Sequence, residues 1–105
     1  MSVNASLQDS ISQLRIRYLK QVEERLLELQ RLFGIGCTRA LEEEERLLLK
    51  TLAHKLSGSG SIFGFTKITE SGRRLEEALI QQPEVSIENI MPLLENLIAA
   101  CVEAE

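Results

Sequence analysis

Apolar residues recur every three to four positions along most of this chain, which is the spacing of one face of an α-helix. The first such stretch follows Ser6, a candidate N-cap with an acidic residue three positions later. Its apolar stripe comprises Leu7, Ile11, Leu14, Tyr18, Val22, Leu26, Leu29 and Phe33. Gly34 and Gly36 follow the stripe and are expected to end the helix. The pattern therefore predicts one long helix over residues 6–33.

Three shorter stretches have the same helical spacing. A second helix is predicted over residues 38–63, with Thr38 as its N-cap and four glutamates in its early turns. A third is predicted over residues 66–81, with Thr66 as its cap and a stop before Pro83, and a fourth over residues 86–104. Their expected inward residues are Leu41, Leu48, Leu52, Leu56 and Phe63; then Ile68, Leu75, Ala78 and Leu79; then Ile90, Leu93, Leu94, Leu97, Ile98 and Cys101.

Pro92 leaves two possible starts for the last helix. Either Asn89 is the N-cap and Pro92 lies in the tolerant first turn, or the helix begins at Ser86 and Pro92 kinks it. In both cases the chain has four amphipathic helices joined by short connections, and none of them can bury its apolar stripe alone. We therefore expect an all-α fold, an antiparallel four-helix bundle that forms a single domain over residues 1–105.

Composition narrows the classes of function. The chain has 105 residues, 44% of them apolar, and a net charge of −4, so nothing in its charge supports binding to nucleic acid. No apolar run is long enough to span a membrane, and the first residues lack the basic and apolar blocks of a secretory signal. Cys37 and Cys101 fit no metal-binding spacing, and we expect both to remain thiols, with Cys101 in the core. We expect a cytoplasmic protein without a metal site.

Residues 54–64 are unusually rich in glycine and serine for a helix. They either form a loop, as a Gly/Ser linker would, or continue the second helix because small residues are needed there. Each glycine inside a helix costs about 1 kcal/mol relative to alanine. The apolar stripe nevertheless keeps its helical phase across the glycines, from Leu56 to Phe63, and this favours a helix. Gly60 and Ser59 then fall near the core edge, where small residues allow a neighbouring helix to approach closely.

The same helical phase places His54 opposite the stripe, so that its imidazole is expected to face solvent. Gly58 follows one turn later on the same face, and Ser57 and Ser61 flank it. An exposed imidazole beside a helix surface without side chains suits close approach by another protein. We expect that partner to dock on a patch formed by Leu47, Lys50, Thr51, Gly58 and Ser61.

The block Ala53-His54-Lys55-Leu56-Ser57-Gly58-Ser59, followed by Gly64-Phe65, resembles the signature of the histidine-containing phosphotransfer (HPt) family. That family has an Ala-His-x-Leu-Lys-Gly-Ser-like block and a second glycine about ten residues past the histidine, on a four-helix bundle. Ser57 stands where the family often has lysine or arginine, and Lys55 supplies a nearby positive charge on a different line of the helix.

The resemblance implies a phosphorelay intermediate. His54 would accept a phosphoryl group from the phospho-aspartate of a receiver domain and pass it to another response-regulator aspartate, with Lys55, Ser57 and Gly58 supporting the phosphate. The implied partners are receiver domains and a hybrid sensor kinase, and the chain would act as a monomer. It has no Gly-rich nucleotide loop, so we expect no ATP site, no autokinase activity and no cofactor, with Mg²⁺ bound by the partner receiver.

Two other functions remain open from the sequence. A non-catalytic helical adaptor would have the fold without the chemistry. The dimerisation and phospho-acceptor part of a sensor kinase is the second, although Lys55-Leu56-Ser57 does not fit the acidic residue and Arg-Thr-Pro expected after its histidine.

Overall fold

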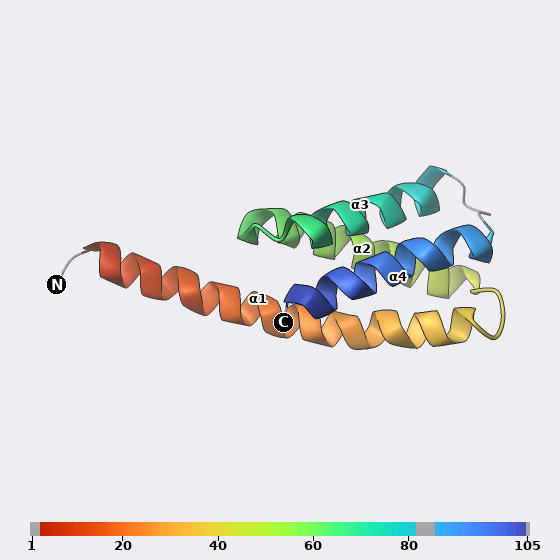
Figure 1. The fold of residues 1–105 in the computed structure, drawn as a ribbon, viewed down its shortest axis with the longest axis horizontal. Coiled ribbons are helices and arrows are strands. Elements are labelled where there is room, and N and C mark those ends of the chain that lie inside the picture. The colour runs from red at the N-terminus through yellow and green to blue at the C-terminus, as the bar shows by residue number, and fades with distance from the viewer. Residues whose placement is uncertain (1–2, 82–85, 105) are drawn as a thin grey trace.

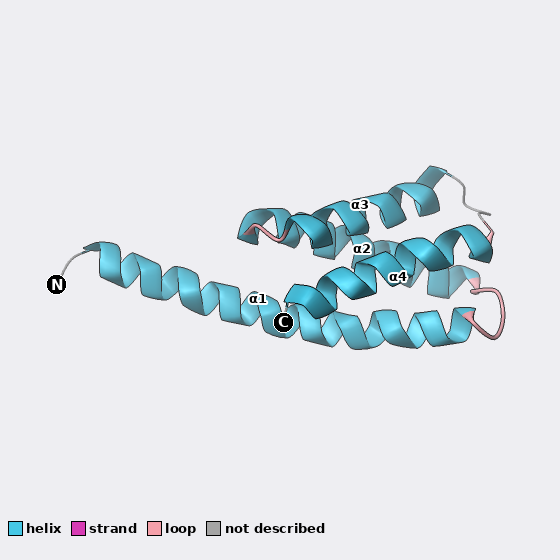
Figure 2. Ribbon diagram, in the orientation of Figure 1, coloured by secondary structure: helices cyan, strands magenta, loops and turns pink. Residues whose placement is uncertain are grey.

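The structure, a computed structural model, describes residues 3–81 and 86–104, which form four helices. They are α1 (Val3–Gly36), α2 (Glu43–Phe63), α3 (Thr66–Gln81) and α4 (Ile87–Ala104). Each of α2, α3 and α4 packs against its neighbours, and α1 closes the bundle against both α2 and α4. The helices lie side by side, and no strand is present in the described residues (Figures 1 and 2). The all-α bundle expected from the apolar spacing is confirmed.

The core consists of apolar side chains from all four helices. It comprises Tyr18, Val22, Leu26, Leu29, Leu32, Leu41, Leu49, Leu52, Ala53, Leu56, Ile68, Leu75, Leu79, Ile90, Leu94, Leu97, Ala100 and Cys101. Most of the predicted stripe residues are therefore buried. Four buried residues were not anticipated: Leu32, Leu49, Ala53 and Ala100. Six residues that were expected to face inward are only partly buried: Phe33, Leu48, Phe63, Ala78, Leu93 and Ile98.

The first third of α1 departs from the prediction. Leu7, Ile11 and Leu14 were expected in the core but are 58%, 53% and 50% exposed. The reason is length: α1 has 34 residues and α2 has 21, so α1 extends past the ends of the other helices (Figure 1). The core ends where Tyr18 stacks on Phe63, with ring centroids 4.7 Å apart.

The helix ends also differ from those expected. α1 begins at Val3, so Ser6 is not its N-cap. α2 begins at Glu43 and not after Thr38, because Glu42 and Glu45 form a reciprocal capping box. The Thr38 hydroxyl instead donates to the carbonyl of Ile35, at the end of α1.

The last two helices start close to the residues predicted for them. Thr66, expected as a cap, is the first residue of α3. α4 begins at Ile87, and the Ser86 hydroxyl accepts a hydrogen bond from the Glu88 amide, so the earlier of the two starts is the one adopted. Pro92 therefore lies inside the helix. No helix among the described residues combines the length and hydrophobicity needed to cross a membrane.

Small residues set the distance between α2 and α3. α2 continues through the glycine-rich segment to Phe63, as its apolar phase predicted. A Cβ atom on Gly60 would lie 2.8 Å from the Thr69 hydroxyl, and one on Gly72 would lie 2.9 Å from the Ala53 carbonyl oxygen. Gly64 then ends α2 with φ 78°, a left-handed conformation that favours glycine. The two helices are thus held close together beside residue 54.

Candidate functional site

His54 lies near the middle of α2, on the face that looks away from the core. Its side chain is 73% exposed, as the helical phase predicted. Its Nδ1 atom lies 2.7 Å from Oε2 of Glu76, whose side chain is only 20% exposed. Glu76 comes from α3, so the close packing of α2 and α3 brings the two side chains together.

This contact determines what the imidazole can do. A neutral imidazole carries one N–H, and a carboxylate can only accept a hydrogen bond. Nδ1 is the ring nitrogen that lies against the Glu76 carboxylate, so Nε2 is the nitrogen of this exposed side chain that is left for an incoming group. The contact therefore holds the exposed imidazole beside Glu76 and leaves one ring nitrogen available as a nucleophile.

The helix surface next to His54 is bare. Gly58 is exposed, and no atom lies within 4 Å of the position that its Cβ would take. The Ser61 hydroxyl donates to the carbonyl of Gly58 and so stays close to the backbone. Thr51, one turn before His54, likewise donates its hydroxyl to the Leu47 carbonyl. A partner can thus approach Nε2 without displacing any side chain at residue 58.

Ser57 has a structural contact that its sequence position did not indicate. Its hydroxyl donates to the Thr69 carbonyl at 3.1 Å, and its Cβ lies 3.2 Å from the position of a Cβ on Gly72. The residue thus holds α3 against α2. Its hydroxyl is directed at the backbone of α3 and not at the solvent beside Nε2.

Positive charge around His54 comes from two helices. Lys50 and Lys55 flank the histidine on α2, and Lys55 is exposed. On α3, Arg73 precedes Glu76 by three residues and therefore shares its side of the helix. Arg74 instead lines a groove against α4. Of the two neighbouring arginines, Arg73 is the one on the side of the His54–Glu76 pair.

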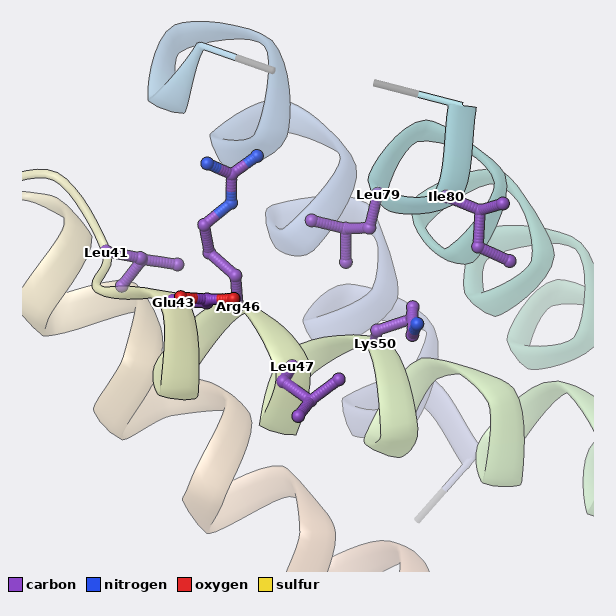
Figure 3. A pocket seen from close by; sticks show the side chains of 7 residues that line it. All are labelled: Leu41, Glu43, Arg46, Leu47, Lys50, Leu79 and Ile80. Carbon is purple, nitrogen blue, oxygen red and sulfur yellow. The ribbon is translucent and has the colours of Figure 1, made fainter. Parts of the chain in front are cut away.

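The expected docking patch is extended by α3. Leu47 is 57% exposed and lines, with Lys50, a pocket whose other wall is formed by Leu79 and Ile80 (Figure 3). Ile80 is itself exposed and lies one turn after Glu76. Apolar and cationic side chains from two helices thus surround the approach to His54.

Glu76 and Ile80 were not identified from the sequence. Both belong to α3. The contacts at Gly60 and Gly72 determine which side of α3 faces α2. The spacing of Ile68, Leu75 and Leu79 gives the inward face of that helix, from which Glu76 could be placed at its edge. Its pairing with His54, however, depends on the register between two antiparallel helices.

The fold and the site together define a class of protein: a helical bundle that presents an oriented, solvent-facing histidine to other proteins. The family model of the Hpt domain matches residues 13–104, and the chain therefore belongs to the Hpt domain family. Membership implies phosphotransfer in two-component signalling and interaction with response-regulator receivers. Neither a search of curated proteins nor a search of solved structures found a match.

Proposed function

We propose that this protein is a phosphorelay intermediate in which His54 carries the phosphoryl group. The observation that carries this proposal is the exposed imidazole whose Nδ1 is held 2.7 Å from Glu76, beside the bare surface of Gly58. Nε2 attacks the phosphorus of a receiver phospho-aspartate in line, and the bond from phosphorus to the aspartate oxygen breaks as the N–P bond forms. The receiver leaves with its aspartate carboxylate restored.

Glu76 is a positioning residue in this scheme. Phosphorylated on Nε2, the imidazole keeps its proton on Nδ1 and carries part of the positive charge, which the carboxylate offsets. The reverse step passes the group to a second receiver aspartate, and Nε2 regains its lone pair. Lys55 and Gly58 surround the phosphoryl group, while Leu47, Lys50, Thr51 and Ser61 contact the receiver. Ser57, expected from the sequence to support the phosphate, instead holds α3 against α2.

We further propose that the chain binds neither ATP nor a cofactor of its own and has no autokinase activity. The Mg²⁺ that neutralises the phosphoryl oxygens belongs to the receiver. A hybrid sensor kinase supplies the phosphoryl group, and the chain acts as a cytoplasmic monomer. In support of a monomer, four helices of one chain already enclose a continuous core, so no second copy is needed to complete it. A helical adaptor without chemistry would not require the His54–Glu76 pair.

Transfer from phosphorylated receiver domains tests the proposal. A panel of receivers carrying labelled phosphate is mixed with the wild-type chain and with His54→Gln, which removes the nucleophile at an exposed position. We expect an acid-labile, base-stable label on the wild type and none on the variant. Absence of label on the wild type across the whole panel, or equal labelling of His54→Gln, refutes the proposal.

Gly58→Leu tests the bare surface separately from the nucleophile. A Cβ atom at residue 58 has no atom within 4 Å and leucine has the better helix propensity, so the helix should be as stable or more stable. Its side chain, one turn from His54, should nevertheless obstruct the receiver and slow transfer by at least about tenfold. Normal transfer by Gly58→Leu would show that the open surface is not needed.

A further inference from the structure

A pocket lies between the start of α2 and the end of α3 (Figure 3). Two of its residues, Lys50 and Ile80, lie about one turn from His54 and Glu76 along their helices. Its apolar walls are Leu41, Leu47, Leu79 and Ile80, and its charged residues are Glu43, Arg46 and Lys50. Leu47 and Lys50 share the exposed face of α2 with His54, since they precede it by seven and four residues. The pocket and the histidine therefore open towards the same side of the molecule.

Arg46 is the unusual member of this pocket. Its Nη2 atom is buried and has no hydrogen-bond partner among the described residues. Figure 3 shows its side chain extending across the pocket, away from α2 and towards the start of α4. Glu43, the acid in the same lining, forms no hydrogen bond with that nitrogen. Arg46 and Lys50 both line the open pocket, so a carboxylate that enters it meets two cations and can form charge-assisted hydrogen bonds with them.

We propose that this pocket receives an acidic side chain of the receiver domain that docks on His54. The planar guanidinium of Arg46 suits a carboxylate, Lys50 adds a second positive charge, and the leucines and Ile80 accommodate apolar neighbours of that acid. A standard interface covers about 800 Å² on each partner, enough to include both the histidine and the pocket. The chain as a whole has a net charge of −4 and would repel an acidic partner. A local cationic site offsets this repulsion where the partner docks.

This inference rests on the proposed function, and its test uses the receiver that labels His54 fastest in the transfer panel. The dissociation constant of that receiver, unphosphorylated and with Mg²⁺, is measured against wild type, Arg46→Met, Lys50→Met and Arg74→Met. Arg74→Met is the matched control, since it removes the same charge from the groove between α3 and α4. We expect Arg46→Met to weaken binding roughly 30-fold, Lys50→Met several-fold less than that, and Arg74→Met to bind as the wild type does. Thermal unfolding of each variant verifies that it is folded.

A double-mutant cycle identifies the occupant. Acidic residues of the receiver are replaced one at a time by alanine, and one of these replacements should weaken binding to the wild type but not to Arg46→Met. Arg46→Met binding as tightly as Arg74→Met would overturn the inference. Binding of a free anion in the pocket would also overturn it. In that case inorganic phosphate would raise the melting temperature of the wild type but not of Arg46→Met, and the two proteins would bind the receiver with equal affinity. These results leave transfer to His54 intact, whereas failure of the whole receiver panel would refute the proposed function.

Discussion

The same substitution, glycine to alanine, should have opposite effects at two positions of the α2–α3 pair. Gly58 and Gly72 both lie inside helices, so each is expected to gain helix propensity when replaced by alanine. Around Gly58 no atom lies within 4 Å of the new Cβ. Around Gly72 the new Cβ would lie 2.9 Å from the Ala53 carbonyl oxygen and 3.2 Å from both Cβ and the amide nitrogen of Ser57.

The magnitudes follow from these distances. Alanine in place of glycine in a helix interior is worth about 1 kcal/mol of stability, and nothing opposes this gain at residue 58. At residue 72 the nearest atoms are two backbone atoms of α2 and the Cβ of Ser57, none of which can rotate away, so α3 must move outward. Overpacking of this kind costs about 1–3 kcal/mol. We therefore expect Gly72→Ala to be less stable than Gly58→Ala by about 1–3 kcal/mol.

Urea unfolding followed by circular dichroism measures the difference, which should also appear as a gap in melting temperature of at least about 4 °C. Gly72→Ala should in addition slow transfer, because the outward movement of α3 separates Glu76 from His54. If the two variants are equally stable, the close approach at Gly72 does not constrain the helices. If Gly72→Ala loses stability but transfers normally, α3 does not position the histidine.

Two further predictions concern single carboxylates. Glu76→Ala should slow transfer to His54 by about ten- to a hundredfold with little loss of helix content, because the imidazole loses its orienting acceptor. Glu76→Gln keeps an acceptor oxygen, so its transfer rate should fall less. Unchanged single-turnover rates of transfer in both variants would exclude a positioning role. Hydrogen bonds from the Arg39 side chain and from the Glu42 backbone lower the pKa of Glu45 to about 2, below its usual 4.5, so its contribution to stability is present above pH 4.5 and is lost as the pH falls towards 2. Glu45→Gln should be less stable than wild type at neutral pH, with the difference shrinking across that window in pH-dependent thermal unfolding; a constant difference would contradict the assignment.

Much of the fold could be predicted from the order of residues alone. The spacing of apolar side chains predicted four helices and most of the core. An amphipathic helix must bury one face, and the residues of that face recur in the sequence at three- and four-residue intervals. It also carried α2 through its glycines and placed His54 in solvent, where it is found. The predictions that were wrong concern helix ends and the extent of the core. Thr38 is not the N-cap of α2, and Leu14, expected in the core, is exposed. Whether a stripe is covered depends on where the neighbouring helices stop.

The partners of His54 were decided by the tertiary structure. Glu76 is distant in sequence, and its carboxylate reaches Nδ1 because Gly72 lets α3 approach the backbone of α2. Ser57 faces α3, and its hydroxyl donates a hydrogen bond to the Thr69 carbonyl. Its position three residues after the histidine did not predict this contact. Helical periodicity fixes which side of a helix a residue occupies. It does not fix the register or the rotation of one helix against another, and those are set by the shapes of the few side chains, and the absent ones, at the contact.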